Sequence, residues 1–428
     1  MTPNGAPAPG RPGAERGPAR QASLRRHNLA LVLGEIAAHG AISRAELSRR
    51  LGLTKATVSS LVDLLTGQGV VQELAAGQAE IVVRPRRPRR GRPANPVAIA
   101  VGAPVAVGVE VAVDYVGVCA LDLAGKLLWH EAVPMPNDEG DPEECLSKAA
   151  AWCQGAVAEV SRSGARVLGV GLALPGVVDN QGQLCSAPNL PRWTGMTPGP
   201  ALEALLGGTV SVLTVGNEAN LAALAELWYG ARRGLRDFVL VSGEIGVGAG
   251  LVVGGQLFAG AAGAAGELGH VTVHARGRPC GCGSRGCLEQ YAGQEALLAA
   301  AGAKSRRALL EGLSRREPRC QRALQEAGQA LGLAVSALVN VVDVPVVVLG
   351  GMYAELAPYL QDVLERELAV RVLSSEWAPV EVVVASLGTE AAMWGAAGSV
   401  VHAFLGDPAA FMPELLEGAE EPGPGARA

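Results

Sequence analysis

The amino-acid sequence predicts an α/β protein of two or three domains, with a small basic helical module at its amino end. The 428 residues include 57 glycines and are 49% hydrophobic, which fits strands and helices joined by tight turns around a large core. Charge is distributed unevenly: residues 1–97 contain 15 Lys and Arg against 6 Asp and Glu, whereas the remainder contains 21 against 35. A basic module joined to an acidic one indicates an anionic polymer as partner at one end only.

The amino-terminal segment, residues 1–22, is rich in Pro, Gly, Ala and Arg. It lacks the apolar stretch of a signal peptide, so we expect a disordered arm. The longest uncharged run, residues 245–266, contains too many glycines for a membrane-spanning helix. We therefore expect a cytoplasmic protein that makes no membrane contact.

Residues 23–83 have the pattern of a winged helix-turn-helix. The first helix ends at Gly40, and Ser43 begins the second, with Glu46 placed three residues later as in a capping box. Gly52 makes the turn, and Thr54 caps the third helix. Two short helices joined by so tight a turn suit the major groove of DNA. The alternative is a helical hairpin that contacts proteins.

The third helix has one face suited to DNA and one suited to a core. Polar and basic side chains near its start, together with those at the preceding caps, can reach phosphates and base edges. These are Ser43, Arg44, Thr54, Lys55, Thr57, Ser59 and Ser60. The side chains expected in the core are Ala56, Val58, Leu61, Leu64 and Leu65.

A pair of wing strands is expected at roughly residues 70–83, followed by an Arg- and Pro-rich linker at residues 84–97. Six arginines lie between Arg84 and Arg92, and the prolines keep this run extended. Arginines on an extended arm suit the narrow minor groove of A·T-rich DNA, so we expect contacts from Arg90 and Arg92. A solvated basic linker is the alternative for this run taken alone.

Residues 266–289 carry the most specific chemistry in the sequence. His270, Cys280, Cys282 and Cys287 follow the spacing H-x9-C-x-C-x4-C, and one imidazole with three thiolates is a common structural zinc set. Because such closed coordination leaves no position for an activated water, we expect a structural Zn2+. The alternatives are three buried free cysteines, or a disulfide between Cys280 and Cys282.

The same segment carries a family resemblance. G-E-x-G-H followed by C-x-C-G-x-x-G-C-L-E resembles the signature of the ROK family, which comprises sugar-responsive repressors and sugar kinases on one actin-like (ribonuclease H-like) fold. The run SRAELSRRLGLTKATVSSLVDLL, the wing and the GRP that follows resemble the winged helix of ROK repressors. The resemblance covers about residues 25–405.

This resemblance implies a two-lobed sugar-binding domain over residues 98–405. The first lobe would span about residues 98–212 and include a closing helix at 389–405, and the second lobe about residues 213–388. The acidic residues 406–428 are rich in Pro and Gly, so we expect them to be disordered.

By the same resemblance, a sugar pocket lies between the two lobes. Its expected ligand-binding residues are Asn189, Asn217, Glu218, Glu267, His270 and Glu289. Each carboxylate can accept hydrogen bonds from a pair of hydroxyls, which gives orientation and specificity. Asn189 has the alternative role of a turn residue, and Asn217 that of a helix cap.

Three elements that resemble the nucleotide and catalytic motifs of ROK kinases are altered. Glu110 to Asp114 stands where the kinases have D-x-G-G-T, and Glu244 replaces the threonine of the second phosphate loop. Glu218 stands at the position of the kinase general base, an aspartate. We therefore expect no catalytic residue, no ATP binding and no enzyme activity.

The combined pattern predicts a sugar-responsive repressor that leaves its operator DNA when sugar binds, and that is nucleoid-associated while on DNA. A homodimer or homotetramer of this kind would require a palindromic operator. Two alternatives stay open: an active ATP-dependent sugar kinase with a DNA-binding domain, and a repressor controlled by a protein partner. The Glu of N-E-A-N resembles regulators of xylose-type pathways more than glucose kinases.

Overall fold

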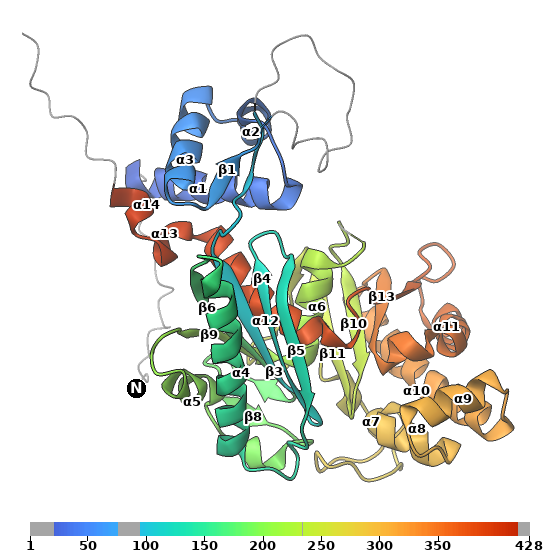
Figure 1. Cartoon of the computed structure of the whole chain (residues 1–428). Coiled ribbons are helices and arrows are strands. Elements are labelled where there is room, and N and C mark those ends of the chain that lie inside the picture. Colours follow the sequence, from blue (N-terminus) through green and yellow to red (C-terminus); the bar gives the residue numbers. More distant parts are fainter. Residues whose placement is uncertain (1–20, 76–94, 233, 418–428) are drawn as a thin grey trace, which may run out of the picture.

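The computed structural model describes residues 21–75, 95–232 and 234–417. Figure 1 shows a small helical unit at the amino end, drawn in blue, and two larger units that each contain a β-sheet flanked by helices. The predicted α/β class with an amino-terminal helix-turn-helix is therefore confirmed. No helix in the described parts of the chain is both long enough and apolar enough to cross a membrane.

The amino-terminal unit contains the three predicted helices, α1 Gln21–His39, α2 Arg44–Leu51 and α3 Lys55–Gly67. The Ser43 hydroxyl accepts a hydrogen bond from Glu46 N at 3.2 Å, and the Thr54 hydroxyl accepts one from Thr57 N at 3.1 Å. Both N-caps are thus formed as the sequence indicates. Because α1 begins at Gln21, the last two residues of the expected arm (1–22) are helical, and the others lie outside the described residues.

The wing differs from the prediction. Strand β1 Val71–Glu73 pairs antiparallel with β2 Val97–Ile99, and Val97 also exchanges backbone hydrogen bonds with Ile42. The described partner of β1 therefore lies beyond residues 70–83, and Val97, the last residue of the expected linker (84–97), is the first residue of this strand. Residues 76–83 of the expected wing lie outside the described residues. Buried Val97 supplies the apolar side chain that the unit needs there, a tertiary requirement that local pattern does not reveal.

One core assignment in α3 is also wrong. Val58, Leu61 and Leu65 are buried and Leu64 is partly buried, as expected, but Ala56 is exposed. Ala56 lies in the first turn of α3, next to the exposed Lys55. It therefore belongs to the exposed face that the sequence assigns to DNA.

The first lobe is built on a five-stranded sheet in the order β5-β4-β3-β6-β9. Its strands are β3 Val105–Val111, β4 Tyr115–Asp122, β5 Leu127–Pro134, β6 Val167–Leu174 and β9 Val212–Asn217. Helix α4 Pro142–Arg162 packs on the face of Val105, Val107 and Val109, and α12 Ala391–Gly406 packs on the opposite face. A Cβ at Gly108 would lie 2.1 Å from Met393 O, so glycine lets α12 approach the sheet closely.

The boundary between the lobes is later than expected. Strand β9 pairs parallel with β6, so the chain belongs to the first lobe as far as Asn217 rather than to about residue 212. Residues 175–211, which include β7 Val177–Val178, β8 Leu184–Ser186 and α5 Pro198–Leu205, connect β6 to β9. Helix α6 Glu218–Tyr229 then leads into the second lobe.

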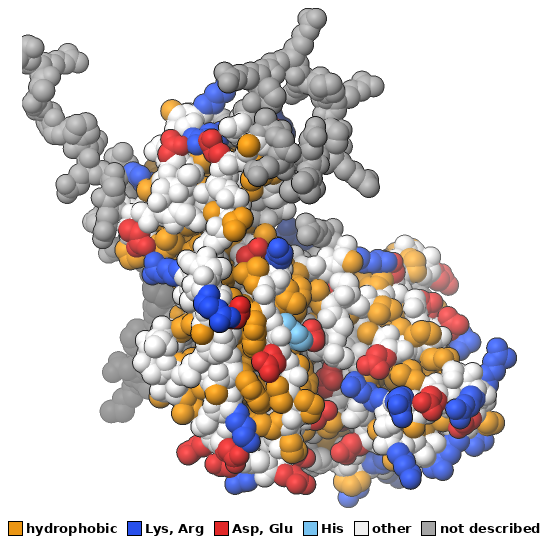
Figure 2. Space-filling model, viewed as in Figure 1, with side chains coloured by type: hydrophobic (Ala, Val, Ile, Leu, Met, Phe, Trp, Pro, Cys, Tyr) orange, Lys and Arg blue, Asp and Glu red, His pale blue; other side chains and the backbone are white. Residues whose placement is uncertain are grey.

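The second lobe has a five-stranded sheet in the order β12-β11-β10-β13-β14. Its strands are β10 Phe238–Gly243, β11 Val247–Val253, β12 Gln256–Leu257, β13 Val346–Gly351 and β14 Glu381–Val384. Helices α10 Pro318–Val342 and α11 Met352–Arg371 cover one face, and α6 covers the other. Figure 2 shows acidic and basic side chains mixed around α8 Gln294–Ala301 and α9 Arg306–Ser314, where ion pairs such as Arg307–Glu311 form.

Residues 406–417 form helices that pack on the protein, so the expectation of a disordered tail at 406–428 is wrong for this part. Helices α13 Pro408–Phe411 and α14 Glu414–Glu417 pack on the first lobe and on α1, with Met412 and Leu415 buried. Asp407 forms an ion pair with Arg26 of α1. The prediction failed because two apolar side chains in an acidic segment suffice for docking; residues 418–428 lie outside the described residues.

Candidate functional site

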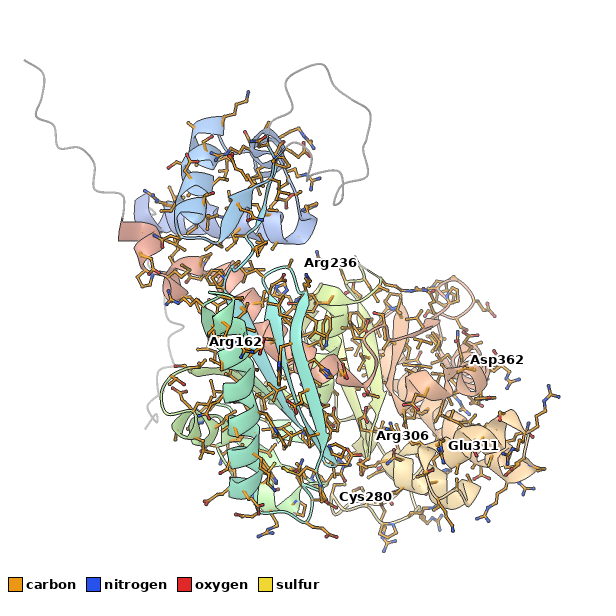
Figure 3. The ribbon with its side chains drawn as sticks, in the orientation of Figure 1. Arg162, Arg236, Cys280, Arg306, Glu311 and Asp362 are labelled. Carbon is orange, nitrogen blue, oxygen red and sulfur yellow. The ribbon has the colours of Figure 1, made fainter. Side chains whose placement is uncertain are left out.

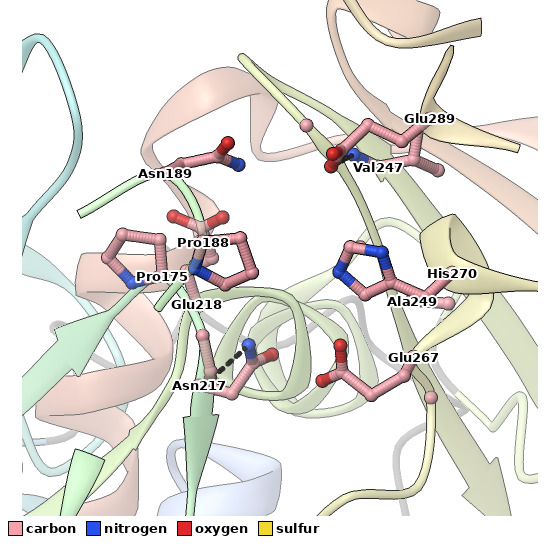
Figure 4. Close-up of a pocket in the computed structure, with 14 residues that line it drawn as sticks. Pro175, Pro188, Asn189, Asn217, Glu218, Val247, Ala249, Glu267, His270 and Glu289 are labelled. Carbon is pink, nitrogen blue, oxygen red and sulfur yellow. Dashed lines mark hydrogen bonds between the residues drawn. The ribbon is translucent and has the colours of Figure 1, made fainter. Parts of the chain in front are cut away.

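A pocket between the two lobes brings together the six side chains that the sequence assigned to a sugar. From the first lobe, Asn189 follows β8 and Asn217 ends β9, and Glu218 begins the connecting helix α6. From the second lobe, Glu267 precedes the short helix η3 Leu268–His270, and His270 ends it. Glu289 begins α7 Glu289–Ala292. In Figure 4, Asn189, Asn217 and Glu218 face Glu267, His270 and Glu289 across the space. Distant segments thus converge on one pocket.

The amide of Asn217 is already engaged. Its Oδ1 accepts a hydrogen bond from Asn220 N at 3.0 Å and caps α6, and its Nδ2 donates to Gly176 O at 2.9 Å. The alternative role of Asn217 as a helix cap is therefore present in the structure. One amide hydrogen is left for a ligand.

Gly246 allows side chains from the two lobes to meet. A Cβ at this position would lie 2.2 Å from Glu289 Oε2 and 2.7 Å from Asn189 Nδ2, so any larger residue would separate them. Val247 N donates to Glu289 Oε2 at 3.3 Å, which orients that carboxylate. Trp193, by contrast, is buried in the core of the first lobe and does not line the pocket.

The pocket is strongly acidic. Burial, followed by the charges of Asp114 and Glu267, raises the pKa of Glu218 to about 7. Burial raises the pKa of Glu267 as well, since the opposing effect of His270 is smaller. Among the residues that the structure describes, no Lys or Arg lines this pocket. Carboxylates and amides without a cation suit hydroxyl donors and repel anions.

The four predicted metal ligands form a compact cluster. The ligand atoms of His270, Cys280, Cys282 and Cys287 lie within 4.8 Å of one another. Cys282 Sγ is 3.7 Å from Cys287 Sγ, and Cys280 Sγ is 3.8 Å from His270 Nδ1. A tetrahedron with Zn–S bonds of about 2.3 Å has edges of about 3.8 Å, so the geometry fits. The cluster can hold a metal ion such as zinc, and the described cysteines form no disulfide.

Backbone contacts hold the loop that carries these ligands. Gly286 has φ 72°, and a Cβ there would lie 1.7 Å from His274 O, so glycine is required. Arg278 N donates to the Tyr291 hydroxyl, and the Arg278 guanidinium lies 4.9 Å from the Tyr291 ring centre. Figure 3 places Cys280 on the loop that leads to α7. These contacts therefore hold the segment from which Glu289 projects.

Three carboxyl groups from the segments that resemble altered kinase motifs come together in the structure. Glu110, Glu218 and Glu244 line a second cavity between the lobes. Burial and then the charge of Glu218 raise the pKa of Glu110 and bring that of Glu244 to about 8. Glu244 also lies over Gly351, where a Cβ would be 2.4 Å from Glu244 Oε1.

On the winged helix, the side chains expected to contact DNA differ in whether they are exposed or already paired. Lys55 and Ser60 are exposed, as is Ala56, which sequence reasoning missed. Arg44 forms ion pairs of 2.7 Å with Asp63 and Glu73, so its charge is partly neutralised within the unit.

The other expected DNA-binding residues either make hydrogen bonds within the helix-turn-helix unit or lie outside the described residues. Ser43 and Thr54 serve as N-caps, and Ser59 O accepts a hydrogen bond from Arg44 at 3.2 Å. Thr57 donates its backbone N–H to Thr54. Arg90 and Arg92 lie outside the described residues.

The fold and the pocket define a two-lobed, actin-like protein of the sugar-kinase type that carries an amino-terminal winged helix. A model described as the ROK family matches residues 106–402, and one described as the MarR family matches residues 30–79. This chain belongs to the ROK family.

Among its relatives, the xylose repressor of Bacillus subtilis (strain 168) is 28% identical, covering 90% of this chain and 98% of the repressor. The regulator NagC of Escherichia coli (strain K12) is 26% identical over 89% of this chain and 94% of its own length. The glucokinase of Streptomyces coelicolor is 28% identical but covers 68% of this chain, and 96% of the glucokinase.

A crystal structure described as a ROK family transcriptional regulator, homologous to the E. coli MLC protein, has the same fold. It superposes with a TM-score of 0.75 at 23% identity and covers 92% of this chain and 99% of that one. A ROK family glucokinase from Streptomyces griseus, solved with glucose and AMPPNP, superposes with a TM-score of 0.60 over 69% of this chain.

Proposed function

We propose that this protein is a sugar-responsive transcriptional repressor that binds operator DNA through its winged helix and releases it when sugar enters the interlobe pocket. The observation that carries this proposal is the extent of the similarity. Repressors match 90% of the chain, including the winged helix, whereas the glucokinase leaves about a third of the chain unmatched. A kinase has no evident use for the additional DNA-binding unit.

The pocket favours an uncharged sugar that carries no phosphate. Three carboxylates line it, Glu218, Glu267 and Glu289, and none of its lining residues is Lys or Arg. A phosphate group would enter this field without a partner, at a high electrostatic cost. Because several relatives are xylose repressors, xylose is the first effector to test.

Two helices connect the pocket to the DNA-binding unit. Glu218 begins α6, and α6 packs so closely on α12 that a Cβ at Gly395 would lie 1.9 Å from Leu221 O. The far end of α12 and the helices that follow it contact α1. A sugar that closes the lobes would therefore displace α12 relative to the winged helix. The sugar can change the affinity for DNA only as far as the sugar itself binds the closed lobes more tightly than the open lobes.

The metal in this proposal is a structural Zn2+ held by His270 and the three cysteines. When bound, it cross-links a Gly-rich loop and leaves no open position for catalysis. With Nδ1 of His270 directed to Cys280, the other ring nitrogen remains for the pocket. The same loop leads directly to Glu289, so loss of the metal would disturb two sugar contacts together.

The degenerate motifs support a binding protein rather than a kinase. Glu110 and Glu244 place carboxylates where ATP phosphates would lie, and Glu218 extends the base position by one methylene. The glucokinase relative keeps an ATP-dependent sugar kinase as the second candidate. A repressor controlled by a protein partner is the third candidate.

We also propose a homodimer or homotetramer, which a palindromic operator would match.

Fluorescence anisotropy tests this proposal with DNA from upstream of the gene and its neighbours, at fixed salt. Tight binding that xylose or another neutral sugar weakens is the expected result. Tight DNA binding that no sugar affects would favour the protein-partner alternative. Absence of DNA binding, combined with sugar-dependent ATP turnover in a coupled assay, would overturn the proposal in favour of the kinase.

A further inference from the structure

A cavity of about 570 Å³ lies along β9, the strand at one edge of the first-lobe sheet. The first lobe lines it with residues 178–182 and 212–217, and the second lobe lines it with Leu257 and Ala259. Helix α6, which connects the lobes, adds Leu224. Pockets for small organic ligands commonly enclose about 300–1,000 Å³. We call this space the β9 cavity, and it has room for a ligand that contacts both lobes.

A wall of backbone separates the β9 cavity from the sugar pocket. Gly176 lines the pocket and Val178 lines the cavity, and in the second lobe Gly266 lines the pocket and Gly263 lines the cavity. A Cβ at Gly263 would lie 2.4 Å from Val178 O, so these two segments are in close contact. Asn217 lines both spaces. The cavity is therefore a neighbouring site, distinct from the sugar pocket.

Asn220 of α6 indicates that the β9 cavity takes a ligand. Its side chain lines the cavity and is only 8% exposed, and its Oδ1 has no hydrogen-bond partner among the described residues. A buried amide oxygen without a donor is costly, and such atoms in folded proteins are normally paired. A ligand hydroxyl in the cavity can supply this donor. The half-buried Thr214 of β9 offers a hydroxyl in the same cavity.

We propose that the β9 cavity binds an uncharged glycoside, as a second ligand beside the sugar of the interlobe pocket. Among the described lining residues there is no Lys or Arg, so a phosphate group would find no cation there. The two carboxylates that line it are already engaged: Asp179 Oδ1 accepts from Gln181 N at 2.8 Å, and Glu203 Oε2 accepts from Val212 N at 3.1 Å. Their remaining oxygens can accept hydrogen bonds from ligand hydroxyls.

Apolar side chains in the β9 cavity favour a glycoside over a small polyol. Leu213 is 44% exposed, and Leu224 and Leu257 are partly exposed. Burial of such surface stabilises a complex, and a ligand must present an apolar face to obtain it. A two-ring glycoside presents hydroxyls at its edges and a C–H or aryl face at the same time. Its hydroxyls would bond Asn220 and Thr214 while that face covers the leucines.

Binding in the β9 cavity would be coupled to sugar in the pocket, a consequence that rests on the proposed function. Asn220 N donates to Asn217 Oδ1 at 3.0 Å, and Asn217 lines both sites. Both lobes line each site, so each ligand favours the lobe arrangement in which its own site is formed. Each ligand is thus expected to raise the affinity for the other by the same factor.

Calorimetric titration of the full-length, zinc-supplied protein tests the site, with xylobiose and 4-nitrophenyl β-xyloside as probes and no xylose present. We expect at least one of the two glycosides to bind. Asn220→Ala and Thr214→Val should each weaken this binding by at least about fivefold, since each removes one hydrogen bond to the ligand. Thr214→Val keeps the shape of the side chain, so its effect cannot arise from a change of packing volume. Glu267→Ala alters the sugar pocket alone and should bind the glycoside as the parent does.

The matched control is Gln325→Ala, which removes an exposed amide from helix α10 and should leave glycoside binding unchanged. No binding of either glycoside at millimolar concentration would overturn the second site. Binding that Glu267→Ala abolishes and the two cavity variants leave intact would also overturn it, because the glycoside would then occupy the sugar pocket.

Anisotropy with operator DNA separates this proposal from the proposed function. Release of DNA by a sugar, in a protein that binds neither glycoside, leaves the proposed function standing while the second site falls. Glycoside binding that the cavity variants weaken, in a protein whose DNA no sugar releases, supports the second site and counts against the proposed function.

Discussion

The side chains around the sugar pocket differ in how free they are to bind a ligand. Asn217 is largely used by the fold and Glu289 accepts a hydrogen bond from Val247 N, whereas no hydrogen bond occupies the carboxylate of Glu267 among the described residues. Glu267 lines the pocket opposite Glu218 and Asn217. It is therefore the residue whose replacement should affect the ligand most and the fold least.

For Glu267→Ala we expect loss of the sugar response with operator binding intact. Removal of a charge-assisted pair of hydrogen bonds should weaken sugar binding by roughly 1.5–3 kcal/mol or more. Calorimetric titration with sugar and anisotropy with operator DNA measure the two effects separately. Glu376→Ala, on the exposed surface, is the matched control. A normal sugar response in the Glu267 variant would refute the assignment of this pocket.

The thiolate cluster makes a second prediction at this scale. Cys282→Ser leaves three ligands and should reduce the bound metal from about one equivalent to nearly none. The Tm should fall by about 2–4 °C for each kcal/mol of stability lost. Atomic absorption and thermal unfolding provide the measurements, with Cys185→Ser, an exposed cysteine outside the cluster, as control. Unchanged metal content in the Cys282 variant would disprove the ligand set.

Glu244 provides a prediction on the pH dependence of stability. Its pKa rises from an ordinary value of 4.5 to about 8 in the folded chain, so the folded state holds a proton that the unfolded state has released. The free energy of unfolding therefore falls as pH rises from about 5 through 8. Glu244→Gln should flatten this dependence and be more stable than the parent by on the order of 1–2 kcal/mol near pH 9.

Urea unfolding at about pH 6 and about pH 9 measures this effect. Glu376→Gln removes a carboxylate from the exposed surface and should keep the parent's pH dependence. If Glu244→Gln instead lost stability equally at both pH values, the carboxyl group would have a hydrogen-bonding role that outweighs its charge.

At the scale of elements, the contact of α6 with α12 is the closest helix packing in the path from pocket to winged helix. Gly395→Ala would place a Cβ 1.9 Å from Leu221 O, whereas Gly155→Ala in α4 meets nothing within 4 Å. The first substitution should cost on the order of 1–3 kcal/mol, and the second should add about 0.5–1 kcal/mol. Thermal unfolding distinguishes them, and equal Tm values would contradict the close packing.

What the sequence could predict at this scale follows from how local each signal is. The caps Ser43 and Thr54 and the spacing of Cys280, Cys282 and Cys287 are written in adjacent residues, and the structure forms them as expected. The pairing of β1 with β2, the ion pairs of Arg44 and the docking of Met412 depend on residues distant in sequence. Periodicity contains no information about such partners, which explains why those predictions were wrong or incomplete.

The pocket shows the same distinction. The six residues come from separate segments, and only the family resemblance could bring them together before the fold was known. The resemblance predicts the positions of these residues but not their hydrogen-bond partners and neighbours. The capping hydrogen bond of Asn217, and the approach of Asn189 to Glu289 next to Gly246, depend on how the chain packs. The burial of Glu110 likewise has no sequence signature, because glutamate in a strand is usually exposed.

At the scale of the whole molecule, the winged helix is joined to the first lobe by a continuous apolar cluster. This cluster includes Leu29 and Leu33 of α1, Phe404 of α12, and Met412 and Leu415 of the segment that follows. Ion pairs of Arg26 with Asp407 and of Arg166 with Glu414 flank it. The helices α13 and α14 thus connect the end of α12 to the DNA-binding unit and to the first lobe.

A chain that ends at Gly406 should therefore separate sugar binding from its effect on DNA. The pocket is formed without α13 and α14, so calorimetry should give a sugar affinity close to that of the parent. Operator binding should become insensitive to sugar, because α12 would no longer reach α1 through Met412 and Leu415. The control ends at Glu417 and keeps both helices, so its sugar response should match the parent. If the shorter chain still released DNA on adding sugar, the signal would have to pass through the direct contact of α12 with α1, or through β2 instead.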